Sequence, residues 1–364
     1  MADFHPRHGP LPLQVRKGWK QVRPRATDKQ LIWDSGADVF CAETDFAGPL
    51  RFAGTGAVDC PLATHPGIPT AYRYCCQMQQ GQRDFSELRA LDARSGEMRA
   101  MFRMAPNQWI VWMCHLLRGG DTLLALVATD ARRPQLTILH QLGFFDLKRK
   151  RTLLIPLPRD AYQPLAVSEA RQELLFYGAE GYQLVNFSGT RLRRAGVKGL
   201  PQGRGAAFHP TRPSVLLGGG TLTEWNLTNG TFQELPVRGQ YPIWAEHGNA
   251  LWFSQSSADL WHYDPKSGEG HWVVRIAGYA RPEQNYSRPL ALSSDGRLLA
   301  AVLTRKVRVS ERPGLEPEPG TPLFRVNRIL VVLDLEAREL WQQPFVADNL
   351  AWIELPQHER QRLN

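Results

Sequence analysis

Short runs of alternating hydrophobic and polar residues dominate the chain from about residue 28 onward, and the spacing of an amphipathic helix is scarce. Such alternation predicts strands with one buried face. The clearest unit, from Arg204 to Leu235, predicts strands at Ala206–His209, Ser214–Gly218, Leu222–Leu227 and Thr231–Leu235. Thr228-Asn229-Gly230 joins the last two, and Asn-Gly favours a tight hairpin because both residues tolerate positive φ. Similar units recur at Pro164–Leu192, Pro242–Val274 and Pro289–Pro344.

A hydrophobic–Asp/Asn–hydrophobic step leads into a polar turn six times along the chain, at Asp92, Asp146, Asn186, Asn226, Asp264 and Asp334. The step from Asp146 to Asn186 is 40 residues, and so is the step from Asn186 to Asn226. The next step, from Asn226 to Asp264, is 38 residues. A period near forty in strand-forming sequence is typical of a β-propeller, in which each repeat forms one small antiparallel sheet called a blade.

We therefore predict an all-β fold, a single β-propeller of four-stranded blades. The repeated steps give six blades. Leu31–Phe52 lacks an inner strand and Leu350–Leu355 lacks partners, so pairing them would build a seventh blade and close the ring, which removes exposed strand edges. We favour seven blades, with six as the alternative. Residues 28–364 would form the propeller and residues 1–27 a basic, Pro-rich N-terminal arm.

One segment carries a family resemblance. Residues 289–300 read Pro-Leu-Ala-Leu-Ser-Ser-Asp-Gly-Arg-Leu-Leu-Ala, which resembles the strand and Ser-x-Asp-Gly-Arg-x-Leu-Ala signature of WD-type and related bacterial β-propeller repeats. Phe208-His209-Pro210 with Val215-Leu216-Leu217 is a weaker copy. The resemblance covers about residues 27–364 at the level of architecture, and a propeller subunit of a bacterial multi-protein system would show the same pattern. Its motifs specify a blade and not an activity, and no repeat closes with the usual Trp-Asp dipeptide.

Composition bears on the redox state of the cysteines, the cellular compartment and the charge of possible partners. Five cysteines in 364 residues, without zinc-binding spacing, indicate reduced thiols. Residues 1–20 contain no apolar stretch of secretory type, and no run of the chain is apolar enough for a membrane helix, so we expect a cytoplasmic protein without a membrane span. The formal net charge of +9 comes mostly from arginine, which suits recognition of carboxylates and phosphates. An acidic partner and a simple solvated basic surface both fit this charge.

The spacing breaks once. Asp264 and Asp334 are 70 residues apart, and the surplus lies in a charged, Pro-containing segment from Thr304 to Asn327. We predict that this segment is an inserted loop that protrudes from the disc. Long loops in compact domains are usually functional or flexible, and the sequence leaves both open.

Motifs for catalysis or cofactor binding are missing. The sequence contains no nucleophile elbow, phosphate loop, HExxH motif or dinucleotide fingerprint, and we predict no catalytic residues, no cofactor and no metal. Gly218-Gly219-Gly220 is better explained as a tight strand connection than as a phosphate cradle. His262 and His271 lie on adjoining strands of one hairpin and can approach each other, but two histidines alone do not define a metal site.

The repeat also sorts the connections by face. In a four-stranded blade, the second-to-third connection and the connection to the next blade lie on the same side of the disc, here called the loop face; the other hairpin turns lie on the turn face. Acidic residues are fewer in the loop-face connections. The candidate partner-binding residues there are Arg132, Arg133, Arg159, Tyr162, Arg204, Arg238, Tyr241, Tyr279, Arg281, Tyr286 and Arg288, and the 304–327 segment adds Arg305, Arg308 and Arg312. Arg and Tyr are enriched at binding hot spots.

Two functional hypotheses follow. The first is a non-catalytic scaffold that binds a protein partner, possibly an acidic one, through the loop face and the 304–327 segment, with the arm as a second attachment. The second is a propeller enzyme or receptor for an anionic small molecule such as an acidic saccharide. Nucleic acid is a further acidic partner that we do not favour, because no recognised binding module is present. The absence of catalytic motifs makes the scaffold the preferred hypothesis.

Overall fold

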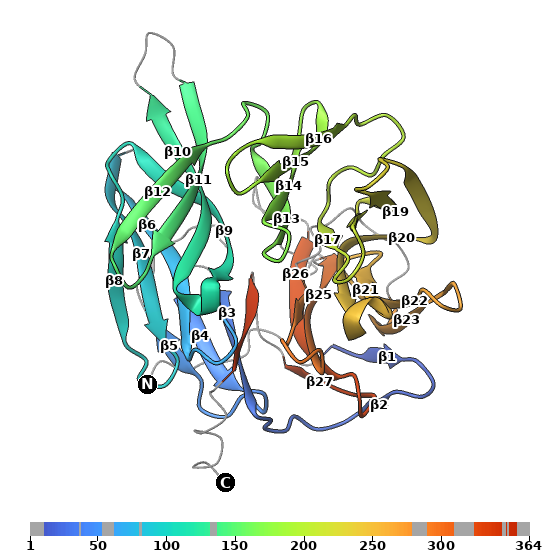
Figure 1. Ribbon diagram of the computed structural model, residues 1–364. Helices are drawn as coiled ribbons and strands as arrows, with labels where there is room; N and C mark the ends of the chain where they lie inside the picture. The colour runs from blue at the N-terminus through green and yellow to red at the C-terminus, as the bar shows by residue number, and fades with distance from the viewer. Residues whose placement is uncertain are drawn as a thin grey trace, which may run out of the picture.

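The computed structural model describes residues 11–35, 38–52, 62–79, 82–131, 137–278, 290–308, 324–343, 347 and 349–354. Strands dominate these ranges, which contain no α-helix and two short 3-10 segments, Arg118–Gly120 and Glu246–Gly248. No helix within the described ranges is long and apolar enough to cross a membrane. Small sheets are arranged as a ring around a common centre (Figure 1). The predicted all-β class is confirmed.

Four sheets follow one another along the first half of the described chain. The first sheet pairs a strand from late in the chain with three early ones. Its order is β28 (Leu350–Glu354), β3 (Lys29–Ser35), β4 (Asp38–Glu43) and β5 (Leu50–Phe52). The second contains β6 (Thr70–Gln79), β7 (Gln82–Asp92) and β8 (Met98–Arg103), with an isolated bridge from Ala63 to Tyr72. The third contains β9 (Gln108–Leu117), β10 (Thr122–Ala131), β11 (Thr137–Asp146) and β12 (Arg151–Pro156). The fourth contains β13 (Gln163–Ser168), β14 (Glu173–Gly178), β15 (Gly181–Asn186) and β16 (Arg191–Ala195).

The second half forms two larger sheets. An eight-stranded sheet contains β17 (Ala206–Phe208), β18 (Ser214–Leu217), β19 (Gly220–Asn226), β20 (Phe232–Ala245), β21 (Ala250–Ser254), β22 (Asp259–Asp264), β23 (Glu269–Ile276) and β1 (Leu13–Val15). A five-stranded sheet contains β24 (Ala291–Leu292), β25 (Leu298–Arg308), β26 (Phe324–Asp334), β27 (Glu339–Gln343) and β2 (Lys20–Gln21). Five of the six sheets in the described residues therefore have four or more strands.

The repeated Asp/Asn step has a local physical cause. At all six positions the side-chain oxygen accepts backbone N–H groups of the turn that follows. Asp92 accepts from Arg94 at 2.8 Å, Asn226 accepts from Thr228 at 2.8 Å, and the other four make equivalent bonds. Asp and Asn favour such turns because their short side chains bond to the backbone two residues on. The repeat therefore encodes turn formation.

The core lies between neighbouring sheets. Along β25, Leu299, Ala301 and Leu303 pack with β21 to β23, whereas the alternate residues Leu298, Ala300 and Val302 pack with β3, β4 and β28. Both sets are almost fully buried. Since successive side chains of a strand point to opposite faces, a sheet buried on both faces needs apolar residues at nearly every position. This requirement explains the continuous hydrophobic run of Leu298–Leu303.

The N-terminal arm lies against the outer strands of two sheets. β1 pairs with β23, and β2 pairs in parallel with β27. Trp19, between them, meets Trp252 edge to face with ring centroids 6.0 Å apart. Arg25 then donates to the buried carboxylate of Asp334 at 2.9 Å. The arm from Leu13 onward therefore covers strand edges that would otherwise be exposed.

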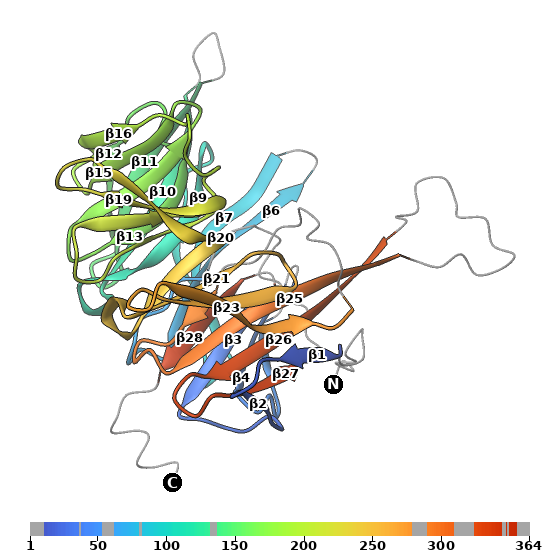
Figure 2. The same ribbon diagram turned by 90° about the vertical axis from the view of Figure 1, so that its right-hand side faces the viewer.

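Two expected loops are partly strand. The residues between the predicted units Arg204–Leu235 and Pro242–Val274 do not form a loop, because β20 runs through them and pairs first with β19 and then with β21. The chain bends there at a register shift, where Tyr241 has a positive φ of 52°. The expected loop from Thr304 to Asn327 begins later than predicted, because β25 and β26 stay paired as far as Arg308 and Phe324. These strands extend away from the disc as a long ribbon (Figure 2), and residues 309–323 lie outside the described ranges.

Candidate functional site

The side chain of Tyr182 holds the connection from β16 to β17 in place through two hydrogen bonds. The hydroxyl of Tyr182 donates to the carbonyl of Pro201 at 2.7 Å and accepts the N–H of Gly203 at 3.0 Å. Tyr182 is fully buried, and this burial raises the pKa of its hydroxyl. Gly203 is required because a Cβ there would lie 2.5 Å from the ring of Tyr177. The loop is therefore held rigidly just before Arg204.

Arg204 is positioned by backbone bonds to two different parts of the eight-stranded sheet. Its N–H donates to the carbonyl of Gly218 at 2.9 Å, and its own carbonyl accepts the N–H of Tyr241 at 2.9 Å. The next residue, Gly205, has a φ of +82°, and a Cβ there would lie 2.8 Å from the Cα of Tyr241. Only glycine permits this approach of two backbones. The backbone of Arg204, which carries the guanidinium group, is therefore held in a fixed position.

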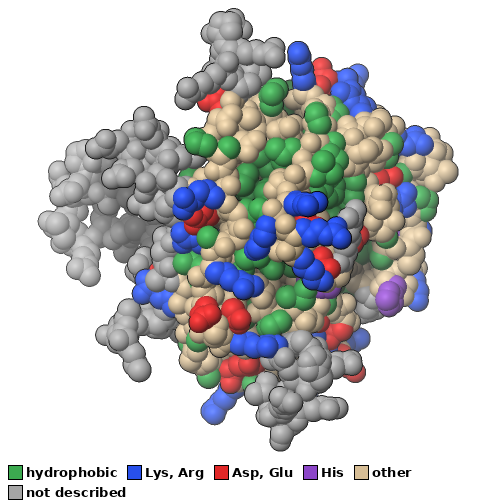
Figure 3. Space-filling view, turned by 60° about the vertical axis from the view of Figure 1, so that its left-hand side comes forward, with side chains coloured by type: hydrophobic (Ala, Val, Ile, Leu, Met, Phe, Trp, Pro, Cys, Tyr) green, Lys and Arg blue, Asp and Glu red, His purple; other side chains and the backbone are tan. Residues whose placement is uncertain are grey.

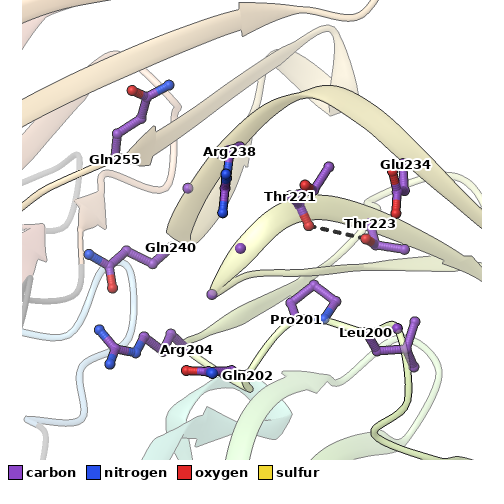
Figure 4. Close-up of a pocket in the computed structure, with 14 residues that line it drawn as sticks. Leu200, Pro201, Gln202, Arg204, Thr221, Thr223, Glu234, Arg238, Gln240 and Gln255 are labelled. Carbon is purple, nitrogen blue, oxygen red and sulfur yellow. Dashed lines mark hydrogen bonds between the residues drawn. The ribbon is translucent and has the colours of Figure 1, made fainter. Parts of the chain in front are cut away.

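A polar cavity of about 450 Å³ opens beside Arg204 (Figure 4). Arg204 and Arg238 both line it, and so do Gln202, Gln240 and Gln255. Within the described residues, neither Arg204 nor Arg238 forms an ion pair or a side-chain hydrogen bond, although Glu234 also lines the cavity. Two guanidinium groups without carboxylate partners give the cavity a positive end. Arginine binds carboxylates and phosphates through a planar fork of donors.

Gln240 stands out among the lining residues. The residue is 8% exposed, and its side chain lines the cavity. In Figure 4 the side chains of Gln240 and Arg204 extend in the same direction. The amide of Gln240 can donate to and accept from a ligand that enters the cavity.

A second cavity, of about 750 Å³, adjoins the first and shares Gln202, Arg204 and Gln240 with it. It lies at the ring centre, because its walls come from the inner strands β13, β17 and the second half of β20. Apolar side chains make up much of the wall, including Leu165, Phe208, Ile243, Trp244 and Leu290. The site therefore combines a polar, basic cavity with an adjoining apolar one.

The predicted partner-binding residues fall into three groups. Arg204 and Tyr241 line the central cavity, and Arg204 and Arg238 line the polar one. Arg159 and Tyr162 are exposed in the connection from β12 to β13 but line neither cavity, and Arg305 and Arg308 lie along β25. Arg132, Arg133, Tyr279, Arg281, Tyr286, Arg288 and Arg312 lie outside the described residues.

The three glutamines were not predicted from the sequence. Gln240 directly precedes Tyr241, one of the predicted partner-binding residues, so its position offered a signal. The burial of Gln240 could not be predicted from the sequence, because it depends on β20 pairing first with β19 and then with β21. Gln202 and Gln255 come from connections of unrelated sequence, and only the folded ring brings them together.

The histidines and cysteines considered as candidate sites do not form a reactive or metal-binding group in the described residues. His262 and His271 do approach each other, with ring centroids 5.1 Å apart, but no group of three or more His, Cys, Asp or Glu that could hold a metal occurs among the described residues. Burial raises the pKa of the Cys41 thiol to about 12 and that of Cys75 to about 11, so neither is a reactive thiolate near neutral pH. Lys and Arg side chains are spread over the face that Figure 3 shows, in keeping with the net charge of +9.

Comparison with solved structures identifies the architecture. A chain from the structure of dihydro-heme d1 dehydrogenase NirN in complex with DHE aligns with a TM-score of 0.52 and 13% identity, over 92% of this chain and 77% of that chain. A chain from a mitotic checkpoint complex aligns with a TM-score of 0.50 and 10% identity, over 93% of this chain and 87% of that one. The chain is a β-propeller. No family model matches it, and no curated protein matches it in sequence.

The comparisons extend to fold and no further. At 10–13% identity, a propeller found in an enzyme and another in a checkpoint complex share architecture with this one, and the fold is compatible with both kinds of role.

Proposed function

We propose that this propeller is a non-catalytic interaction protein that binds an acidic segment of a protein partner on its loop face. The observation that carries the proposal is the pair Arg204 and Arg238, two guanidinium groups that line one cavity and have no ion-pair partner in the described part of the chain. Charged groups that lack internal partners beside a concave surface favour an oppositely charged ligand. A bacterial multi-protein assembly in the cytoplasm is the setting we propose.

The full binding surface would be larger than the two cavities. It would include the exposed residues Arg159 and Tyr162 and the ribbon residues Arg305 and Arg308, and the predicted residues outside the described ranges would complete it. The N-terminal arm is a less suitable attachment point than expected, because β1 and β2 already pair with β23 and β27. We retain residues 1–27 and 28–364 as the proposed arm and propeller.

Pull-down from the native source tests this proposal. The Arg204→Glu/Arg238→Glu variant should lose partners that the wild type recovers, because the positive end of the cavity becomes negative. Arg191→Glu/Lys266→Glu is a matched control, since it makes the same change in charge at exposed turn-face positions. Equal recovery of partners by the wild type and the cavity variant would reject the proposed surface, provided that both melt at similar temperatures.

We also propose that the ring has seven blades. The eight-stranded sheet would then count as two blades that share β20, and β28 would close the ring on β3. Seven separate hydrophobic clusters support this count, because each lies between two neighbouring blades. One of them joins β25 and β26 to β3 and β4, which is the contact that closure requires.

A receptor or enzyme for an anionic small molecule, such as an acidic saccharide, is the second candidate. The concave shape of the polar cavity and its three glutamines favour it, since amide side chains suit hydroxyl-rich ligands. A thermal-shift screen with glucuronic and galacturonic acid oligomers separates the candidates. A rise in melting temperature for wild type but not for Arg204→Glu/Arg238→Glu would favour the small molecule.

A further inference from the structure

The two cavities have complementary chemistry at a shared border. The polar cavity offers Arg204 and Arg238, and the central cavity offers the apolar side chains of Phe208, Ile243 and Leu290. The border itself consists of Gln202, Arg204 and Gln240. A ligand that fills both must therefore present a negative group and an apolar group next to each other.

We propose that the propeller recognises a short extended peptide in which Asp or Glu stands directly beside an aromatic or large aliphatic residue. The carboxylate lies between Arg204 and Arg238, and the apolar side chain enters the central cavity. This inference rests on the proposed function and adds the chemistry of the recognised motif. Charge complementarity argues for the acidic residue, because the two arginines outnumber the one carboxylate that lines the polar cavity, Glu234.

Gln240 argues for a peptide in particular. Its side chain lines both cavities at their shared border. A side-chain amide has both a donor and an acceptor, and so does a peptide group, so the two can form a pair of hydrogen bonds. A peptide backbone that crosses the border from one cavity to the other would pass this amide.

The cavity walls provide a way to separate the two halves of the motif. Ala207 lines the central cavity from β17 and belongs to none of the hydrophobic clusters in the described residues, whereas its neighbour Phe208 packs against one. Ala207→Phe should therefore fill the central cavity with little effect on the core. Arg238→Gln removes one positive charge from the polar cavity at an exposed position, and Gln240→Leu removes the amide at nearly constant volume.

Display of random dodecapeptides on phage, selected against the full-length protein, is the decisive experiment. The Arg204→Gln/Arg238→Gln variant serves for counter-selection. The recovered sequences should place Asp or Glu beside Phe, Tyr, Trp, Leu or Ile. A synthetic peptide of the recovered sequence, measured by fluorescence polarisation, should bind Arg238→Gln and Gln240→Leu about tenfold or more weakly, the size expected for a lost hydrogen bond that involves a charged or buried group. Ala207→Phe should weaken peptides that have the apolar residue but not peptides in which serine replaces it.

The outcomes separate the two proposals. Acidic peptides with no apolar preference, or peptides whose binding is unchanged in Ala207→Phe, would overturn the two-cavity motif and leave the acidic-partner proposal standing. Failure to recover any peptide that prefers the wild type to Arg204→Gln/Arg238→Gln would overturn both. Circular dichroism and melting temperature of each variant exclude loss of folding as the cause.

Discussion

Asp34 and Arg73 form a buried ion pair between two neighbouring sheets. Their side chains are 3% and 1% exposed, and Nη1 of Arg73 lies 3.0 Å from Oδ2 of Asp34. Asp34 also accepts the backbone and side-chain N–H groups of Asn349, at 2.7 and 2.8 Å. One carboxylate therefore holds β3, β6 and the entry to β28 together.

Removal of the cation should be costly at this position. Arg73→Ala leaves the charge of Asp34 buried without its ion-pair partner, so we expect a loss of about 3–5 kcal/mol in the free energy of unfolding. Urea denaturation measures it. Arg51→Ala, which removes the partner of Asp38 at an exposed site, should cost less than about 1 kcal/mol. Equal losses in the two variants would contradict this account.

Gly205 gives a second prediction for a single residue. Gly205→Ala would place a Cβ 2.8 Å from the Cα of Tyr241 at a φ of +82°, so the backbone that positions Arg204 must shift. Gly296 has a similar φ of +73° but open space around it, so Gly296→Ala should cost only about 1–2 kcal/mol from backbone strain. We expect a larger loss for Gly205→Ala in chemical denaturation. A smaller loss than for Gly296→Ala would show that the two backbones are not tightly packed.

The arm and the turn between β26 and β27 are joined to one buried carboxylate. Asp334 accepts from Arg25 and Arg297, at 2.9 and 3.0 Å, and from the N–H of Ala337. Burial alone would raise the pKa of Asp334, but the hydrogen bond from Ala337 and the charges of the two arginines outweigh it and hold the pKa below its ordinary value. The folded state therefore favours the ionised form.

The lowered pKa of Asp334 makes the free energy of unfolding depend on pH. A lowered pKa contributes stability above the unfolded value, near 3.9, and this contribution is lost as the pH falls through the folded value. Asp334→Asn should therefore be less stable than wild type by about 1–2 kcal/mol at pH 7, and the difference should shrink below pH 4. Urea denaturation at several pH values measures this. A difference that stays constant down to pH 2 would contradict the assignment.

The residues of the WD-type signature make contacts that join separate strands. The hydroxyl of Ser293 donates to Asp295 at 2.6 Å, and the other carboxylate oxygen of Asp295 meets the buried ammonium of Lys29 at 2.9 Å. Lys29 also lies 3.5 Å from Glu354 at the end of β28. The motif therefore connects the turn after β24 with β3 and β28, and its role is structural.

At the scale of the whole molecule, β28 completes a sheet that begins near the other end of the chain. Its residues enter two clusters, with Trp352 on one side and Ala351 and Ile353 on the other. A chain that ends at Asn349 should therefore lose roughly 5 kcal/mol of stability, from the burial of Trp352 and Ile353. Differential scanning calorimetry of the shortened chain tests this.

A synthetic peptide of residues 349–355 should restore the lost stability when added to the shortened chain. The matching peptide with serine in place of Trp352 and Ile353 should not, because it cannot fill either cluster. Restoration by both peptides, or by neither, would argue against β28 as a required strand of the ring.

Much of the fold and part of the site could be predicted from the sequence. Strands of the unit around Arg204, the Asn-Gly hairpin and the turns after Asp92 and Asp264 follow from interactions within a few residues, and such interactions are visible in a local pattern. The same register placed Arg204 and Tyr241 on the loop face, and in the structure both line the central cavity. The path of β20 was not predictable in this way, because its Pro236 suggested a loop whereas pairing with β19 and β21 decided otherwise.

The sequence by itself determined the all-β class, the period and the turn chemistry, because these depend on neighbours along the chain. The tertiary structure alone decided that Arg204 and Arg238 share a cavity, that Gln240 lines the border of two cavities, and that Lys29 meets Glu354. Each of these depends on strands far apart in sequence that the ring brings side by side. Their contacts arise from packing around a common centre, which no local pattern of residues records.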